Sequence, residues 1–310
     1  MVYGKTAVAA AISRGIEVRG FPLRGRLEIE SPLGRLEADL QGERLARLQA
    51  DKALAPLQYI FSDLFSRFHR AVGLKIAIHS SIPDRAGLAS SAAVSSALIA
   101  LIFSFLGERW KVEEAVELVY ASELRIQRRG SVIGSSCTVN GGFVCVSNGK
   151  WRRLAIQPEG LEILIVDTGE RCATSDTTAR VRGLWNRDPK GAGALFDEMN
   201  EIAEEGRRRL EQKKWDEVGS LMNRNQERLR WLGVSTPRID SLTRELRDWV
   251  YGAKITGAGG GGCVLCLPKE GAEKRIAEIV MREGGVLLEA DLCGEGVCSR
   301  SEETLCRRSS

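Results

Sequence analysis

The chain has 310 residues, of which 43% are hydrophobic and 28% are charged, so it can bury a sizeable core as one large domain or two smaller ones. Its net charge of +4 is too small to indicate a nucleic-acid partner, and no apolar run reaches the roughly 18 residues that a membrane span needs. The eight cysteines are scattered, and the close pair Cys263 and Cys266 would point to opposite faces of a strand. We therefore expect free thiols in a reducing cytoplasm rather than a metal site.

The first 50 residues contain short alternating segments, such as 27–30, that predict β-hairpins. Periodicity predicts the later elements in chain order as a helix over 52–71, a strand over 74–79, helices over 94–105 and 111–129, strands over 143–146 and 161–166, helices over 174–185, 192–212, 215–232 and 237–249, strands over 253–255 and 263–267, a helix over 269–283 and a strand over 285–290. The change in character after residue 167 predicts two domains, 1–168 and 169–292, and a polar tail over 293–310. We expect ligands to bind in a cleft between the two halves.

A run of five glycines in six positions lies at 257–262, between two apolar strand segments. Each glycine permits a positive φ or a close approach of the backbone, at a cost in entropy that needs a reason. Consecutive N–H groups in such a turn form a concave, electropositive surface for phosphate oxygens. The alternative is a flexible linker, but linkers are rarely flanked by apolar strands. The residues assigned to this phosphate and substrate loop are Gly257, Ala258, Gly259, Gly260 and Gly261.

A second small-residue loop, S-I-P-D-R-A-G-L-A-S-S-A-A over 81–93, joins an alternating strand to an alanine-rich helix. Nucleotide phosphates bind to such loops through the unsatisfied N–H groups and the dipole of the helix. The alternative is a serine N-cap on a buried helix, and the pattern is neither a Walker A loop nor a G-x-G-x-x-G loop. The residues predicted to bind the nucleotide are Pro83, Gly87, Leu88, Ala89, Ser90, Ser91 and Ala92.

Together these two loops resemble motifs two and three of the GHMP kinases, a superfamily that includes galactokinase and the homoserine, mevalonate and phosphomevalonate kinases. The chain is most similar to archaeal mevalonate kinases, which it also resembles at 2–12, 167–169, 221–226 and 232–234. The resemblance implies an α+β fold with a β-rich N-terminal domain of the ribosomal-protein type and a helical plus ferredoxin-like C-terminal domain. It also implies ATP, Mg²⁺ and a small-molecule substrate, with no nucleic-acid or membrane partner, and it allows a homodimer.

In this family a helix glutamate holds Mg²⁺, and Glu123 matches it. The resemblance makes Glu123 and Ser91 the expected catalytic pair and metal ligands, whereas the alternative for Glu123 is a solvated helix residue. The aspartate that mevalonate kinases carry eleven positions later falls on Gly134, and no carboxylate lies between Glu123 and Glu159. Phosphoryl transfer does not require this aspartate, because positioning and charge neutralisation supply most of the acceleration.

The segment over 125–137 instead resembles a loop of mevalonate-diphosphate decarboxylases, which bind a phosphorylated substrate. Arg128 and Arg129 would bind that phosphate, or they lie at a solvated helix C-terminus, where cations suit the helix dipole. The printed sequence begins inside the first family motif, so the family's opening strand and its G-E-H-A segment either precede Met1 or are missing. Thr174 and Ser175 are therefore among the few remaining candidates to hold the acceptor.

The expected activity is transfer of the γ-phosphate of ATP to a hydroxyl of mevalonate, or of a phosphorylated relative, in isoprenoid biosynthesis. Decarboxylase-type chemistry and a non-catalytic nucleotide-binding role are the alternatives. The acceptor, the hydroxyl attacked and the oligomeric state are not determined by the sequence.

Overall fold

The computed structural model describes residues 4–127 and 131–300. These residues form two compact units that interleave along the chain. The first, which we call the glycine-loop unit, contains 4–14, 82–90 and 142–294; the second, the five-stranded unit, contains 15–81, 91–127, 131–141 and 295–300. These units do not correspond to a single boundary near residue 168, and the division into domains 1–168 and 169–292 stays a prediction.

The five-stranded unit is built on one sheet, whose strand order is β2-β6-β3-β4-β5. The strands are β2 (Ile16–Pro22), β3 (Arg26–Ser31), β4 (Gly34–Gln41), β5 (Arg44–Ala50) and β6 (Leu74–Ser80). Neighbours are antiparallel except β3 and β6, which are parallel. Alternate side chains, such as Leu27 and Ile29 in β3, are buried, so that one face is apolar and the other carries the charges.

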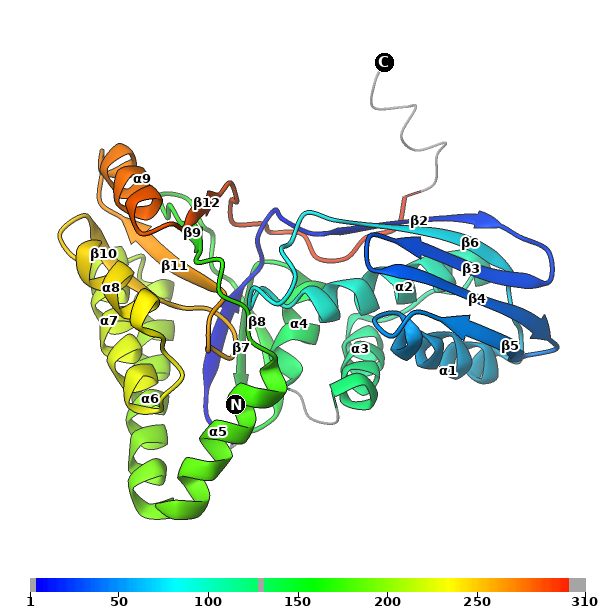
Figure 1. Cartoon of the computed structure of the whole chain (residues 1–310), viewed down its shortest axis with the longest axis horizontal. Helices are drawn as coiled ribbons and strands as arrows, with labels where there is room; N and C mark the ends of the chain where they lie inside the picture. The colour runs from blue at the N-terminus through cyan, green and yellow to red at the C-terminus, as the bar shows by residue number, and fades with distance from the viewer. Residues whose placement is uncertain (1–3, 128–130, 301–310) are drawn as a thin grey trace. The chain divides into compact units, whose positions relative to one another are not determined.

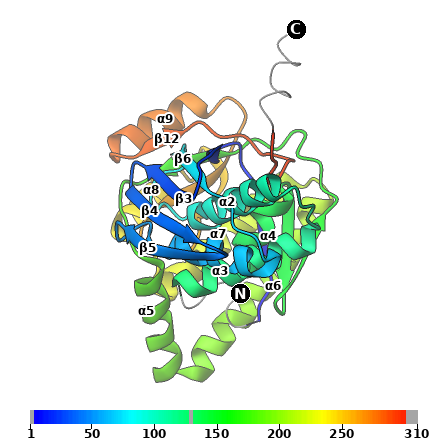
Figure 2. The same cartoon turned by 90° about the vertical axis from the view of Figure 1, so that its right-hand side faces the viewer.

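Helices α1 (Gln58–Phe68) and α2 (Ser90–Leu106) cover the apolar face of this sheet (Figures 1 and 2). The short η1 (Ala55–Leu57) leads into α1, α3 (Val112–Gln127) packs against α1, and α4 (Val132–Asn140) packs against α3. Phe61 and Phe65 of α1 and Phe103 of α2 are fully buried. The predicted β-hairpins and the first three predicted helices are present, each within a few residues of its expected ends.

Helix α4 was not predicted; it contains the last part of the segment over 125–137 that resembles a decarboxylase loop. The N–H of Ile133 donates to the Ser131 Oγ at 3.3 Å, which caps the helix. Val132 and Val139 are buried in this unit. The segment contains glycine, serine and threonine, which are weak helix formers, and burial of its apolar side chains overrides that low propensity.

The glycine-loop unit contains two antiparallel sheets, with the orders β10-β11-β9-β12 and β1-β7-β8. Their strands are β1 (Ala7–Ala10), β7 (Phe143–Ser147), β8 (Lys150–Leu154), β9 (Leu164–Asp167), β10 (Val250–Ile255), β11 (Cys263–Pro268) and β12 (Val286–Leu288). The helices of this unit are α5 (Thr174–Arg187), α6 (Pro189–Glu211), α7 (Trp215–Trp231), α8 (Pro237–Glu245) and α9 (Glu273–Arg282).

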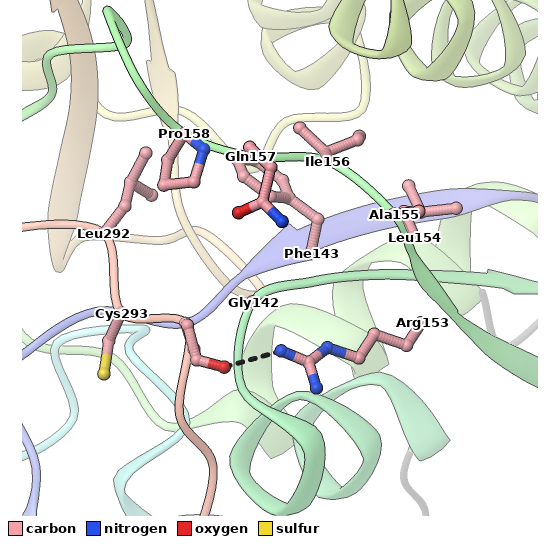
Figure 3. A pocket seen from close by; sticks show the side chains of 12 residues that line it. Gly142, Phe143, Arg153, Leu154, Ala155, Ile156, Gln157, Pro158, Leu292 and Cys293 are labelled. Carbon is pink, nitrogen blue, oxygen red and sulfur yellow. Dashed lines mark hydrogen bonds between the residues drawn. The ribbon is translucent and has the colours of Figure 1, made fainter.

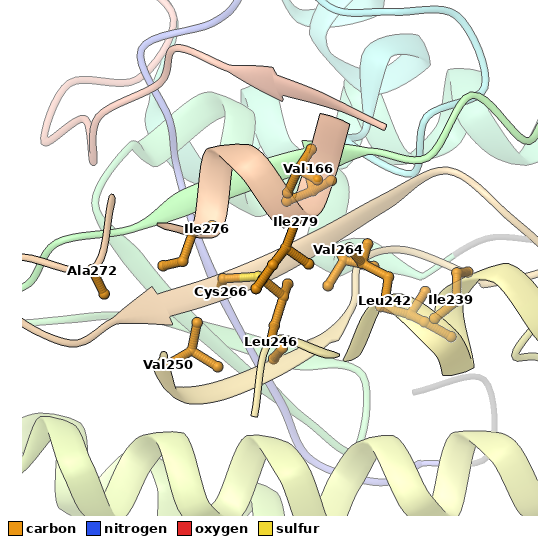
Figure 4. Close-up of a cluster of buried hydrophobic side chains, with 13 residues drawn as sticks. Val166, Ile239, Leu242, Leu246, Val250, Val264, Cys266, Ala272, Ile276 and Ile279 are labelled. Atoms are coloured by element: carbon orange, nitrogen blue, oxygen red, sulfur yellow. The ribbon is translucent and has the colours of Figure 1, made fainter. Parts of the chain in front are cut away.

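The four-stranded sheet buries side chains on both faces. On one face, Val264 and Cys266 of β11 pack against Ile239 of α8 and Ile276 of α9 (Figure 4). On the other face, Leu267 of β11 packs in a cluster with side chains of α7. Both strands that flank the glycine loop are therefore anchored in a core. The α+β class is confirmed, and no helix in the ranges 4–127 and 131–300 is long and apolar enough to span a membrane.

Candidate active site

The glycine loop over 257–262 connects β10 to β11 and turns with positive φ angles. Gly257, Gly259, Gly260, Gly261 and Gly262 have φ values of +62°, +84°, +78°, +135° and +83°. This region of backbone space is costly for residues with a Cβ. A Cβ at Gly259 would lie 2.5 Å from the Val234 carbonyl oxygen. Both the backbone angle and the space around it therefore exclude a side chain at Gly259.

The second small-residue loop, over 82–90, lies directly against the glycine loop within the glycine-loop unit. The Cys263 N–H donates to the Ala86 carbonyl oxygen at 2.9 Å. A Cβ at Gly257 would lie 2.7 Å from the Cα of Gly87, and a Cβ at Gly87 would lie 3.0 Å from the Thr256 carbonyl oxygen. The two loops predicted to bind phosphate are thus brought together by contacts that only glycine permits.

Several N–H groups of these loops make no hydrogen bond within the described part of the chain. They are those of Gly87 and Leu88 in the first loop and of Gly257, Ala258, Gly259 and Gly261 in the second. Unsatisfied backbone donors on a concave turn attract anions, because no other partner competes for them. This arrangement suits phosphate oxygens.

The remaining backbone groups of the glycine loop are held by its neighbours. The Gly260 N–H donates to the Val234 carbonyl at 2.7 Å, and the Gly262 N–H donates to the Glu170 carbonyl at 2.8 Å. The buried hydroxyl of Thr177 in α5 donates to the Gly259 carbonyl at 3.1 Å. Thr177 was not predicted as a site residue, and no local sequence pattern signals a contact between residues so far apart.

The predicted acceptor residues Thr174 and Ser175 are exposed in the first turn of α5, the helix that carries Thr177. The capping residue Ala173 has no side-chain oxygen, so no side chain caps this helix end. The positive end of a helix with unsatisfied N–H groups attracts anionic groups. The structure thus places both residues on the helix that contacts the glycine loop.

An ion pair stands beside the loop at the end of β9 and was missed by sequence reasoning. Arg171 binds Asp167 with both terminal nitrogens, at 2.7 Å each. The guanidinium and the Gly169 N–H hold the pKa of the Asp167 carboxyl below its usual value. In the sequence, the D-T-G segment at 167–169 was noted only as a family resemblance. The signal that could have predicted the ion pair is the arginine four positions after Asp167.

Lys254, the residue before Ile255 at the end of β10, is the second missed residue. Its side chain is half-buried, and burial of the ammonium group lowers its pKa to about 8. Its Nζ donates to the Ile255 carbonyl at 2.8 Å, and no carboxylate in the described ranges lies within 4.0 Å of it. A half-buried cation with so few partners beside the glycine loop would suit an anionic ligand.

Glu123 belongs to the five-stranded unit and is buried, with 8% of its surface exposed. The hydroxyls of Ser91 and Ser95, on α2, donate to its Oε1 at 2.7 and 3.2 Å. Burial raises the pKa of the carboxyl, and the two hydroxyl donors oppose that rise. The alternative of a solvated helix glutamate is therefore excluded, and the two residues predicted as metal ligands are in direct contact.

The chemistry of this pair fits Mg²⁺, which prefers hard oxygen ligands. Among the residues that the structure describes, no group of three or more acidic, histidine or cysteine side chains could form a complete metal site. Mg²⁺ at kinase sites is usually held by one or two carboxylates together with phosphates and waters. One buried carboxylate beside a serine hydroxyl matches that requirement.

Arg128, Arg129 and Gly134 are the remaining positions that the sequence analysis singled out. Arg128 and Arg129 lie outside the described residues. Gly134 lies in the first turn of α4, so a side chain there would not meet the strain of a positive φ.

The glycine-loop unit also has a cavity of about 280 Å³, which no residue of the two small-residue loops lines (Figure 3). Its walls come from the start of β7, the segment after β8 and the chain near Leu292, and Arg153 donates to the Gly294 carbonyl at 2.7 Å on its rim. None of the predicted site residues lines it. The residues predicted to bind phosphate therefore lie outside this cavity.

Comparison with known proteins gives two family matches. Residues 56–141 match the model of the GHMP kinases N terminal domain, and residues 207–286 match that of the GHMP kinases C terminal domain. The chain is 30% identical to mevalonate kinase of Pyrococcus furiosus over 96% of this chain and 92% of that protein. It is 32% identical to mevalonate kinase of Thermococcus gammatolerans over 98% of this chain and 94% of that protein.

Solved structures agree with this. A crystal structure of mevalonate kinase superposes with a TM-score of 0.80 and 25% identity, covering 95% of this chain and 94% of the other. Phosphomevalonate kinase of Streptococcus pneumoniae has a TM-score of 0.77 at 17% identity, over 93% of each chain, which shows the fold alone. Two domain models, close relatives and the paired small-residue loops all agree: the chain belongs to the GHMP kinase family and has its α+β fold.

Proposed function

We propose that this protein is an ATP- and Mg²⁺-dependent kinase that phosphorylates a hydroxyl of mevalonate or of a close relative, in isoprenoid biosynthesis. The observation that carries the proposal is the contact between the loops over 82–90 and 257–262. Six of their N–H groups, those of residues 87, 88, 257, 258, 259 and 261, have no acceptor in the described chain. Relatives named mevalonate kinase, at 30 and 32% identity, support this acceptor. The free cysteines suit a reducing cytoplasm, and a homodimer stays a prediction.

The roles of the residues follow from their positions. The N–H groups of the two loops bind the phosphates of ATP and stabilise the charge that develops on the transferring group. Ser91 and Glu123 hold Mg²⁺, which neutralises negative charge on the phosphates when it is bound. Lys254 adds a positive charge beside the glycine loop below a pH of about 8. Thr174 and Ser175 orient the acceptor at the N-terminus of α5.

Proton removal from the acceptor has no aspartate assigned to it, because Gly134 occupies that position. We propose that positioning and charge supply most of the rate, since the transition state of phosphoryl transfer is loose and needs little help from a base. The kinase is then active as it stands, at a lower rate than one with a base.

Gly134→Asp tests this assignment. We expect kcat to rise by about tenfold or more, as general-base catalysis supplies at least that much. The fold should tolerate the change, because aspartate near a helix N-terminus is favourable and glycine is a poor helix former. Gly134→Asn is the matched control, which gains the same side-chain volume without the charge. A rate equal in the two variants would show that position 134 does not face the acceptor hydroxyl.

The acceptor is identified by measuring ADP and CO₂ separately in the presence of ATP and Mg²⁺. We expect ADP release that depends on mevalonate or on its 5-phosphate, without CO₂. If Arg128 or Arg129 binds a phosphate, the phosphorylated substrate has the lower KM and replacement of that arginine by alanine removes the preference, by about tenfold or more for a charged contact. Release of CO₂ would establish decarboxylase-type chemistry instead, and nucleotide binding without ADP would establish a non-catalytic protein.

A further inference from the structure

Helix α7 lies directly against β10, the strand that leads into the glycine loop. A Cβ at Gly219 of α7 would lie 2.5 Å from the carbonyl carbon of Tyr251, and a Cβ at Gly252 of β10 would lie 2.0 Å from the Gly219 carbonyl oxygen. The helix backbone and the strand backbone therefore touch, which is possible only because both positions are glycine. Short polar side chains on this face of α7 can then reach the backbone of the strand.

Two amide side chains do so. Among the strands of the described ranges, β10 is an edge strand that pairs only with β11, so one side of its backbone has no strand partner there. The Asn223 side chain donates from Nδ2 to the Tyr251 carbonyl at 3.1 Å and accepts from the Ala253 N–H at 3.0 Å. The Gln226 Oε1 accepts from the Ile255 N–H at 3.0 Å. These two amides replace the missing strand along the free edge of β10.

The orientation of the Gln226 amide is fixed by a chain of hydrogen bonds. The carboxylate of Asp240 can only accept, so the Ser235 hydroxyl donates to it, at 2.6 Å. The Ser235 oxygen accepts from the Gln226 Nε2 at 3.1 Å. The amide oxygen must then face Ile255, and the side chain is 4% exposed, so water does not compete for the contact.

We propose that Gln226 is a positioning residue of the glycine loop. It fixes the N–H of Ile255, the last residue of β10, two positions before Gly257. The N–H groups of Gly257 and Gly259 have no acceptor in the described chain, so their direction depends on how the loop is held at its ends. The Gly262 N–H, bound to the Glu170 carbonyl, anchors the far end, and Gln226 anchors the near end.

This inference rests on the proposed phosphate-binding role of the loop. Gln226→Met keeps the length of the side chain and removes both of its hydrogen bonds. We expect kcat to fall by about tenfold, with the KM for the acceptor within about twofold, because a misdirected N–H weakens charge stabilisation in the transition state. Ser235→Ala leaves Gln226 in place but lets its amide rotate. We expect kcat in this variant to fall by about threefold, a smaller loss because the Ile255 contact still forms part of the time.

Asn223→Leu is the matched control, since it removes two hydrogen bonds to the same strand farther from the loop. We expect Tm to fall in Asn223→Leu by at least as much as in Gln226→Met, with kcat within about twofold of the parent. Hydrogen exchange gives a readout that does not depend on activity: the Ile255, Gly260 and Gly262 amides should exchange faster in Gln226→Met but not in Asn223→Leu.

Equal losses of kcat in Gln226→Met and Asn223→Leu would overturn the proposal, as would unchanged exchange of these amides in Gln226→Met. If Gln226→Met does not fold, an unchanged kcat and unchanged exchange in Ser235→Ala would overturn it. A parent protein without ATP-dependent transfer would refute the proposed function, while the exchange data would still decide whether Gln226 positions the loop.

Discussion

Replacing Glu123 by glutamine is expected to lower kcat by about 100-fold, the upper end of what the loss of one charged contact costs, about 3 kcal/mol. Glutamine keeps the shape of the side chain and can still accept hydrogen bonds from Ser91 and Ser95. It loses the negative charge that a hard cation requires. Higher Mg²⁺ should therefore restore part of the rate, which is checked by titrating Mg²⁺ in the parent and the variant.

The same substitution should leave the fold as stable or make it more stable. Burial raises the pKa of Glu123 above its unfolded value, so the folded state resists ionisation and the carboxylate form costs stability at neutral pH. In the parent, this cost begins to shrink as the pH falls through the folded pKa and is gone below the unfolded pKa, whereas the variant has no such dependence. Comparison of Tm from neutral to acid pH measures the difference.

The activity of the parent should fall as the pH is lowered, whereas its stability gains from the loss of the buried charge. The parent needs the carboxylate, so metal binding weakens as the pH falls through the raised pKa, earlier than for an ordinary glutamate. Glu117→Gln is the matched control, because it makes the same change on an exposed residue of the same helix α3. We expect its kcat and its Mg²⁺ dependence to equal those of the parent. A Mg²⁺ dependence equal to that of the parent in Glu123→Gln would refute the metal role.

Gly259→Val is expected to abolish measurable turnover and to weaken nucleotide binding strongly. The Cβ would lie 2.5 Å from the Val234 carbonyl oxygen, a backbone atom that cannot rotate away, and φ is +84°. A β-branched residue is strained at such an angle, by about 1–3 kcal/mol. The loop must then move, and its N–H groups lose their common direction. Nucleotide titration and initial rates check both effects.

Gly271→Val separates backbone strain from the clash. Gly271 also has a positive φ, +74°, but a Cβ there meets no atom of the residues that the structure describes within 4 Å. This variant should lose stability from strain alone and keep its nucleotide affinity and kcat. If Gly259→Val folds and turns over like Gly271→Val, the glycine loop does not bind the nucleotide or its γ-phosphate.

The sequence by itself determined the family and most of the elements. Its two small-residue loops are local signals, because glycine and serine at these spacings are needed for positive φ and for capping, and their order along the chain is typical of GHMP kinases. The predicted helices match because their apolar residues recur with helical spacing. Helix α4 was missed because glycine, serine and threonine are weak helix formers, and only the burial of Val132 and Val139 makes the segment helical.

The tertiary structure alone decided which residues act on the loops. Nothing local in the sequence indicates that Thr177 bonds to Gly259, that Gln226 bonds to Ile255, or that Ser91 and Ser95 both bond to Glu123. These contacts join segments that are 28 to 82 positions apart, and their geometry depends on how strands and helices pack. Hydrogen bonds are short and directional, so a sequence pattern can name the donors and acceptors, but only the packed fold determines which of them meet.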